Sequence, residues 1–289
     1  MDSTLTRSQF RILEALESSG TLSQDDYHSD DFKAMCDTGM ITEGGKLLRE
    51  GYMALEPYIA KRATFIAAGF GSRLVPITLN TPKPLVRVNG TRIIDTLIDA
   101  VLSAGINEIY IVRGYLAEQF DQLLYKYPML KFIENPAYNE ANNISSAMCV
   151  RYLLSNAYVI ESDLLLRNPK LIRKYNYTSN FLGIKKARFD DWCFTVNDDG
   201  IITAHAVGGL DCWQEVGISY WNDYDGRKLS EHIRLAYDMP GGKEKYWEQI
   251  PLSVFLEEYK VEIRECSESD VVEIDTWREL KVIDGAYNV

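Results

Sequence analysis

The stretch ATFIAAGFGSR at residues 63–73 places a short, mainly apolar run, 64–68, directly before a glycine-rich turn. We expect this run to form a buried first strand that ends where the glycines begin. A turn rich in glycine lets backbone N–H groups approach a phosphate closely. Arg73 and Lys83, the latter within TPKPL at residues 81–85, supply fixed positive charge for a triphosphate. The sequence therefore predicts a phosphate-binding loop after the first strand.

Two common phosphate-binding motifs do not describe this turn. Leu74 stands where the third glycine of G-x-G-x-x-G belongs, and no Gly-Lys followed by Ser or Thr is present to make a Walker A loop. A G-x-G pair alone is most often only a tight turn. The combination with Pro-Lys-Pro-Leu, which begins at residue 82, is far more specific.

Strands and helices alternate downstream of the turn, which predicts an α/β fold with a doubly wound, mostly parallel, Rossmann-like sheet. The expected helices are 93–103, 116–126 and 142–154, and the expected strands are 108–112, 131–134 and 158–161. Beyond residue 180 strand-like runs dominate, which predicts a β-rich substrate region. Helices around 226–237 and 244–257, a last strand at 271–274 and a helix from 276 complete the expected elements.

Residues 1–62 lack the alternation of strands and helices that begins at residue 63. We therefore expect two domains, a small module at 1–62 and the main domain at 63–289. The segment ITEGGKLLREGYMALEPY at 41–58 resembles the wing and last helix of MarR-type winged helices. The module carries seven Lys and Arg against eleven Asp and Glu, whereas a DNA reader should be basic on one face. We therefore expect a docking or oligomerisation role for it.

Composition excludes several classes of function. The whole chain carries 31 Lys and Arg against 42 Asp and Glu, a net charge of −11, which argues against a nucleic-acid binder. No apolar run is long enough to span a membrane, and the first residues do not read as a secretory signal. Five cysteines without a Cys-x-x-Cys pair fit reduced thiols, so a cytoplasmic location is expected.

Two carboxylates are candidate metal ligands. Asp163 follows the strand expected at 158–161, at the end of an α/β sheet where ligands bind, and Asp275 closes the last expected strand. Two such carboxylates can meet at one Mg²⁺, which prefers oxygen ligands. Alternatively, each could be a solvated or capping residue, and Asp275 fits the N-cap of the terminal helix.

Aromatic side chains in the second half predict a site for an amine, because ring faces attract quaternary ammonium groups. The rings are Trp192, Trp213, Tyr220, Trp221, Tyr246 and Trp247, and the carboxylates near them are Asp190, Asp191 and Glu215. The substrate-binding candidates are Asp191, Trp192, Tyr220, Trp221 and Trp247. Trp192 and Trp247 are preferred as cage members because acidic residues flank each of them. The alternative is that these rings only build the core of a small sheet.

The series AAGFGSR, TPKPL, VNG at 88–90 and AGI at 104–106 resembles nucleotidyltransferases that join an NTP to a phosphorylated small molecule. GYLAEQF at 114–120, NNISS at 142–146, YVIESD at 158–163 and VVEID at 271–275 resemble the bacterial CTP:phosphocholine cytidylyltransferases. Two departures stand out. Glu161 replaces the first Asp of the family's Asp-x-Asp, and Arg113 precedes Gly-Tyr where a small apolar residue is more usual.

The resemblance implies a Mg²⁺-dependent enzyme that forms CDP-choline and pyrophosphate from CTP and phosphocholine. Arg73 and Lys83 would be the catalytic cations that hold the triphosphate, and Asp163 and Asp275 would bind Mg²⁺. The expected nucleotide-binding residues are Ala68, Gly69, Gly71, Ser72, Gly114, Tyr115, Asn142, Asn143 and Ser145. A homodimer is compatible with the sequence.

Three alternatives stay open. A cytidylyltransferase for 2-aminoethylphosphonate or phosphoethanolamine would need fewer rings around the amine and more carboxylates. A sugar-1-phosphate nucleotidyltransferase would need polar residues for the sugar hydroxyls. A winged-helix regulator with a ligand-sensing, inactive transferase domain is disfavoured, because Arg73, Lys83, Asp163 and Asp275 are all present.

Overall fold

The computed structural model describes residues 4–288, which form two compact units. The N-terminal unit comprises the residues up to Ile59 together with Tyr175–Tyr177. The main unit comprises the rest and begins at Ala60, just before strand β1 (Arg62–Ile66). The function of the N-terminal module stays a prediction.

The N-terminal unit is helical around its own small core. Its helices are α1 (Arg7–Ser19), α2 (Gln24–Tyr27), α3 (Asp30–Asp37) and α4 (Arg49–Leu55). Thr6 begins α1 with a capping box, and Gly20 ends it in the left-handed conformation that glycine adopts without strain. Ile12, Leu13 and Met35 are almost completely buried in this core.

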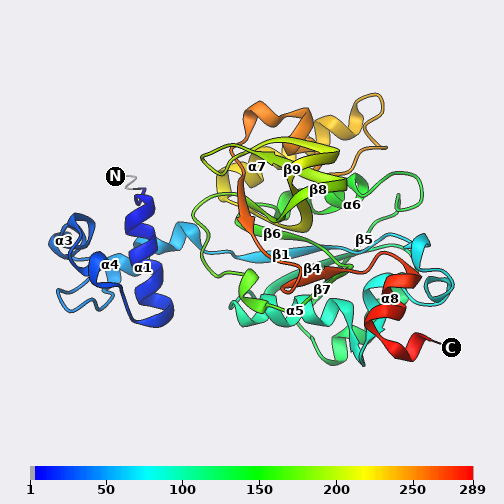
Figure 1. The fold of residues 1–289 in the computed structure, drawn as a ribbon, viewed down its shortest axis with the longest axis horizontal. Coiled ribbons are helices and arrows are strands. Elements are labelled where there is room, and N and C mark those ends of the chain that lie inside the picture. The colour runs from blue at the N-terminus through cyan, green and yellow to red at the C-terminus, as the bar shows by residue number, and fades with distance from the viewer. Residues whose placement is uncertain (1–3, 289) are drawn as a thin grey trace. The chain divides into compact units, whose positions relative to one another are not determined.

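The main unit is built on one seven-stranded sheet in the order β10-β8-β9-β6-β1-β4-β5 (Figure 1). Strands β6, β1, β4 and β5 run parallel, whereas β9 lies antiparallel to β6 and to β8. The remaining strands of the sheet are β4 (Glu108–Arg113), β5 (Lys131–Glu134), β6 (Ala157–Glu161), β8 (Asn180–Val196), β9 (Ile202–Trp221) and β10 (Glu262–Glu265). The predicted α/β class with a mostly parallel sheet is confirmed.

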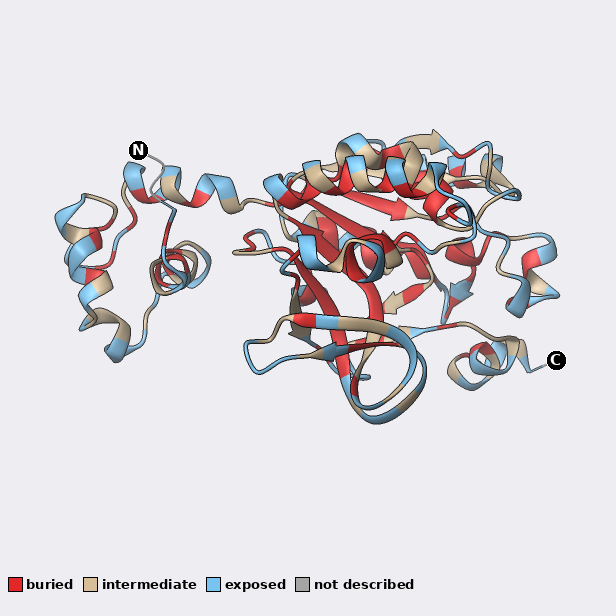
Figure 2. Ribbon diagram, turned by 90° about the horizontal axis from the view of Figure 1, so that it is seen from above, coloured by how far each residue is buried: buried red, intermediate tan, exposed pale blue. Residues whose placement is uncertain are grey.

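Helices cover both faces of this sheet, because its central strands carry apolar side chains on both sides. Figure 2 shows these central strands as largely buried. Adjacent residues of one strand enter different cores, as Ile111 and Val112 do on β4. Helix α5 packs on one face, and α6 and α7 pack on the other. Their bounds are α5 (Ile93–Ser103), α6 (Ile144–Val150) and α7 (Asp223–Asp238). None of the helices in the described residues has the length and apolar character to cross a membrane.

Several expected elements differ in detail. The segment 117–125 is a 3₁₀ helix, and only residues 144–150 of the helix expected at 142–154 are α-helical. The helix expected at 244–257 is a series of turns with one π turn at Ile250–Val254, where Pro251 has no N–H to donate.

The last predicted strand lies outside the main sheet. Strand β11 (Val271–Glu273) pairs antiparallel with β7 (Leu164–Leu166), which directly follows β6. A second small sheet joins β2 (Arg87–Val88) and β3 (Thr91–Arg92), and α8 (Trp277–Ile283) follows β11. The β7–β11 pairing brings the ends of two distant segments together.

The β8–β9 hairpin extends well past the sheet. Most of the strand-like region beyond residue 180 forms two long strands, one of 17 residues and one of 20, which pair with each other. The pairing shifts along the hairpin, and Cys193 pairs with both Ala206 and Gln214. The hairpin therefore curls, which turns side chains of both strands toward the carboxyl end of β6.

Candidate active site

The glycine-rich loop leaves β1 and carries Arg73, one of the two predicted catalytic cations. Gly71 adopts a left-handed conformation with φ 67° and precedes a 3₁₀ turn at Ser72–Leu74. A Cβ atom on Gly71 would lie 3.1 Å from Cβ of Lys83, so this close approach favours glycine. The loop thus lies directly against the TPKPL segment.

Three carboxylates, which we call the metal cluster, meet beside this loop. Oxygens of Asp163, Glu273 and Asp275 all lie within 4.8 Å of one another. The β7–β11 pairing places Glu273 opposite Leu164, one residue from Asp163. Glu273 was not predicted, although it stands two residues before Asp275, and strand residues two apart share a face.

Lys83 and Arg73 balance the metal cluster. Lys83 Nζ lies 2.8 Å from Oδ2 of Asp163 and 2.7 Å from Oδ1 of Asp275. Burial alone would lower the pKa of Lys83, but the two carboxylates raise it overall, so the amine stays charged. Arg73 Nη2 donates to Asp275 over 2.8 Å, and its side chain is 62% exposed and accessible to a ligand.

The metal cluster fits Mg²⁺ by its chemistry. All its donors are carboxylate oxygens, and Oδ1 of Asp163 is buried without a hydrogen-bond partner among the described residues. Removal from water, with Asp163 and Asp275 as negative neighbours, raises the pKa of Glu273 to about 9. A divalent cation would relieve this repulsion and satisfy the open oxygen.

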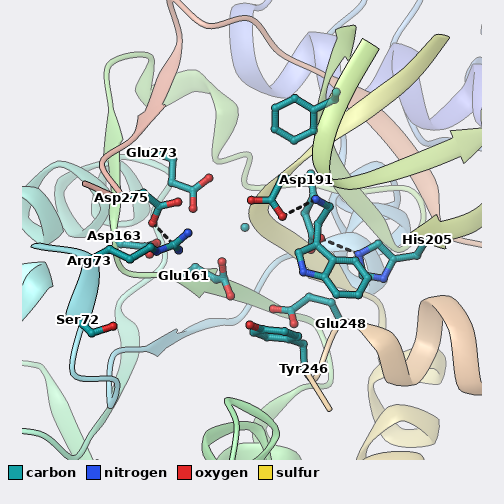
Figure 3. Close-up of a pocket in the computed structure, with 14 residues that line it drawn as sticks. Ser72, Arg73, Glu161, Asp163, Asp191, His205, Tyr246, Glu248, Glu273 and Asp275 are labelled. Carbon is teal, nitrogen blue, oxygen red and sulfur yellow. Dashed lines mark hydrogen bonds and ion pairs between the residues drawn. The ribbon is translucent and has the colours of Figure 1, made fainter. Parts of the chain in front are cut away.

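A cavity of about 400 Å³ extends from the metal cluster between the loop and the curled hairpin (Figure 3). Figure 3 shows Ser72 and Arg73 near the metal cluster, Tyr246 and Glu248 at the other end, and Glu161 between them. The cavity is lined by Ser72, Arg73, Glu161, Asp163, Phe189, Asp191, Trp192, His205, Glu215, Gly217, Tyr246, Glu248, Glu273 and Asp275. Seven of these are carboxylates, so the cavity suits a positively charged ligand.

Beyond the metal cluster the cavity is lined by Glu161, Glu215 and Glu248, which we call the glutamate cluster. Nδ2 of Asn143 donates to Glu161 Oε1 and to Glu248 Oε2, over 3.3 Å in each case. A Cβ atom on Gly217 would lie 2.6 Å from Glu161 Oε2, so glycine on β9 leaves space for that carboxylate. Glu161, whose role was open from the sequence, therefore belongs to this cluster.

The glutamate cluster is short of positive charge. Burial, followed by the charge of Glu215, raises the pKa of Glu248 to about 8. Burial and the neighbouring Glu248 and Asp163 also raise the pKa of Glu161. Adjacent carboxylates in a site poor in water retain protons unless a cation is present.

Three rings line the cavity at this end, Phe189, Trp192 and Tyr246. The Trp192 and Tyr246 rings meet edge to face with centroids 5.8 Å apart. Asp191, whose Oδ1 accepts from the Trp192 backbone N–H over 2.8 Å, also lines the cavity. Asp191 and Trp192, both predicted from the sequence as substrate contacts, therefore line the cavity.

The other three predicted substrate contacts are core residues, which corrects that expectation. Tyr220 and Trp221 are fully buried and Trp247 is 1% exposed. Alternation along β9 turns Tyr220 into one core and Trp221 into the other. The Trp247 ring packs against Phe181 and Trp221, at centroid distances of 6.1 Å. Burying large apolar rings outweighs the acidic sequence context that suggested an exposed cage.

The predicted nucleotide residues divide into two groups. The first group lies together, because Tyr115 N donates to Ala68 O over 3.0 Å. It consists of Ala68, Gly69, Gly71, Ser72, Gly114 and Tyr115. The segment from Asn142 to Ser145 has other partners. Ser145 is buried and bonded to Asn135, Asn142 binds the backbone of Lys243 and Glu244, and Asn143 faces the glutamate cluster. Their side chains bond to other parts of the protein, and their role at the nucleotide stays a prediction.

Residues 63–179 match the family model described as Nucleotidyl transferase. The chain is 34% identical over 228 residues to a 2-aminoethylphosphonate cytidylyltransferase of Lancefieldella rimae, covering 78% of this chain and 92% of that relative. It is 30% identical over 223 residues to a choline-phosphate cytidylyltransferase of Streptococcus pneumoniae, covering 77% and 96%.

A solved structure of CTP:phosphocholine cytidylyltransferase from Streptococcus pneumoniae shares the fold with a TM-score of 0.73 at 30% identity, over 79% of this chain and 99% of that one. The match covers 92% to 99% of the length of these relatives. The chain therefore belongs to the nucleotidyl transferase family and is a cytidylyltransferase.

Proposed function

We propose that the enzyme transfers CMP from CTP to a small phosphonate or phosphate that carries a primary amine, with Mg²⁺ as cofactor. The acceptor that fits best is 2-aminoethylphosphonate. The observation that carries this proposal is the glutamate cluster, which shares one cavity with the metal cluster. The sequence relative that acts on this phosphonate supports the same choice.

A primary ammonium matches the glutamate cluster in charge and in hydrogen bonding. It carries three N–H donors, and ionised carboxylates are acceptors only. Glu161, Glu215 and Glu248 come from three different segments and offer acceptors from several directions. Because burial raises the pKa of Glu248, an incoming cation gains more from its carboxylate than it would in water.

Phosphocholine is the second candidate, because Phe189, Trp192 and Tyr246 line the same end of the cavity. Trimethylammonium has no N–H, so it would leave the buried glutamate oxygens without hydrogen-bond donors. Three of the five substrate contacts predicted from the sequence are also absent from the cavity, since Tyr220, Trp221 and Trp247 are in the core. Fewer rings and more carboxylates favour the primary amine.

The residues position two substrates for an in-line displacement. An oxygen of the acceptor forms a bond to the α-phosphorus of CTP, the bond from that phosphorus to the α–β bridging oxygen breaks, and pyrophosphate leaves. Arg73 and Lys83 offset the charge of the triphosphate and of the leaving group. When bound at Asp163, Glu273 and Asp275, Mg²⁺ supplies further charge neutralisation on phosphate oxygens. The glutamate cluster orients the acceptor and so reduces the entropic part of the barrier.

Pyrophosphate release from CTP tests the proposal against a panel of acceptors. The panel contains 2-aminoethylphosphonate, phosphoethanolamine, phosphocholine and glucose 1-phosphate. We expect kcat/KM to be highest for 2-aminoethylphosphonate and to disappear when Mg²⁺ is chelated. A higher kcat/KM for phosphocholine would select the second candidate, and a preference for the sugar phosphate would overturn the proposal.

A further inference from the structure

His205 lies on β9 and lines the cavity next to Glu215, and its side chain is only 1% exposed (Figure 3). Its Nε2 lies 2.7 Å from Oε2 of Glu215. A carboxylate only accepts hydrogen bonds, so Nε2 is the nitrogen that carries the proton. Nδ1 is buried and has no hydrogen-bond partner among residues 4–288. The imidazole is therefore tied to the site through one nitrogen only.

The same ring also supports Trp192. The two ring centroids are 4.5 Å apart with planes 32° from parallel, and Phe194 packs against the imidazole at 5.3 Å. Glu215 and Trp192 both line the cavity, and they come from different strands of the curled hairpin. One buried side chain thus contacts both a carboxylate and an aromatic face that point toward the ligand.

We infer that His205 is a positioning residue for acceptor specificity, one that holds the Glu215 carboxylate and the Trp192 ring in place to receive the amine. The inference rests on the proposed function. A glutamate side chain alone has many rotamers, and ordering them on binding would weaken the complex. The bond to Oε2 fixes one rotamer in advance and leaves Oε1 for the ligand.

Two substitutions separate the two contacts of His205. His205→Phe keeps a flat ring against Trp192 and removes the donor to Glu215. His205→Gln keeps an N–H donor at a similar reach and removes the ring. Each is compared with His232→Phe, a matched control on α7 whose ring stacks on Phe255 and which does not line the cavity.

The measurement is steady-state kinetics with 2-aminoethylphosphonate and with ethylphosphonate, which lacks the amine. For His205→Phe we expect KM for 2-aminoethylphosphonate to rise about tenfold, with KM for CTP and for ethylphosphonate within about twofold of wild type. In His205→Gln, KM for 2-aminoethylphosphonate should stay close to the wild-type value, since this variant keeps the bond to Glu215. His232→Phe should leave all three KM values within about twofold of wild type.

The outcomes distinguish the inference from the proposed function. Two results would overturn the inference and leave His205 with only a structural role. One is an equal increase in KM for the two phosphonates in His205→Phe. The other is an equal increase in KM for 2-aminoethylphosphonate in His205→Phe and His205→Gln. A wild-type enzyme that does not discriminate 2-aminoethylphosphonate from ethylphosphonate would instead overturn the proposed function. Circular dichroism and KM for CTP confirm that each variant is folded.

Discussion

The metal cluster and the glutamate cluster each consist of three carboxylates, yet they differ in what opposes the negative charge. At the metal cluster, Lys83 Nζ lies within 2.8 Å of one oxygen of Asp163 and one of Asp275. Arg73 Nη2 lies 2.8 Å from the same oxygen of Asp275. At the glutamate cluster, the side chains that hold the carboxylates are Asn143, which is neutral, and His205. Neither carries the fixed charge of a lysine or arginine.

This difference indicates which cation each end receives. The protein supplies cations at the end where CTP brings a strongly negative triphosphate, so charge there can be redistributed among Lys83, Arg73 and a metal. The other end carries carboxylates but no lysine or arginine among its lining residues. A cation must therefore arrive with the acceptor, and the predictions below test this contrast in order of expected effect.

The largest effect is expected at the metal cluster. Asp163→Asn removes one negative charge with little change of shape, and turnover at saturating Mg²⁺ should fall about 1000-fold or more. The control is Asp198→Asn, an exposed residue in the turn between β8 and β9, which should leave turnover unchanged. Near-normal turnover of Asp163→Asn would remove this residue from the metal site.

The next effect is expected at the glutamate cluster and should appear in one substrate only. Glu248→Gln keeps the shape of a buried side chain and removes its charge. KM for 2-aminoethylphosphonate should rise about 10- to 100-fold while KM for CTP stays the same. Glu257→Gln, at an exposed position, is the control. A parallel rise in KM for CTP would show that the two ends are not functionally separate.

Trp192 and Trp247 sharpen the contrast between a lining ring and a core ring. Trp192→Ala should raise KM for the acceptor about three- to thirtyfold. Trp247→Ala should instead lower the free energy of unfolding by about 3–5 kcal/mol, because a buried ring leaves a cavity. Urea unfolding beside acceptor kinetics separates these outcomes. Loss of acceptor affinity without loss of stability in Trp247→Ala would contradict its place in the core.

A smaller effect concerns pH. Glu248 has a pKa of about 8 in the folded protein against 4.5 as the ordinary value, so between these limits the folded chain holds a proton that the unfolded chain has released. The free energy of unfolding therefore falls as pH rises through this window. The melting temperature without ligand should be about 5 °C lower at pH 8.5 than at pH 6, and Glu248→Gln should reduce this slope. An identical slope in the variant would show that Glu248 is ionised throughout.

The smallest effect on chemistry is expected from removing the N-terminal module. A chain that begins at Ala60 retains both clusters, so KM for CTP and for the acceptor should stay within about twofold of wild type. Stability can fall, because Tyr175 and Tyr177 pack with the N-terminal unit and would lose their partners. A truncated chain that is folded by circular dichroism but inactive would show that the module is required for catalysis.

The sequence predicted the metal end better than the acceptor end. Arg73, Lys83, Asp163 and Asp275 all meet in the structure, because each follows a strand or a tight loop whose position an α/β sheet constrains. Glu273 was missed despite a readable signal, its spacing of two from Asp275. At the acceptor end, the sequence indicated Glu215 and Tyr246 as residues near the amine, but it did not predict Glu248 or Phe189 as contacts.

The sequence by itself determined the strand order along the chain, the glycine loop and its cations, because local periodicity and short motifs encode them. Only the tertiary structure decided which aromatic residues face the ligand. Trp192 and Trp247 have similar acidic neighbours in sequence, yet one lines the cavity and the other is 1% exposed in the core. The curl of the β8–β9 hairpin and the turns after α7 set this difference, since burial depends on packing between segments distant in sequence.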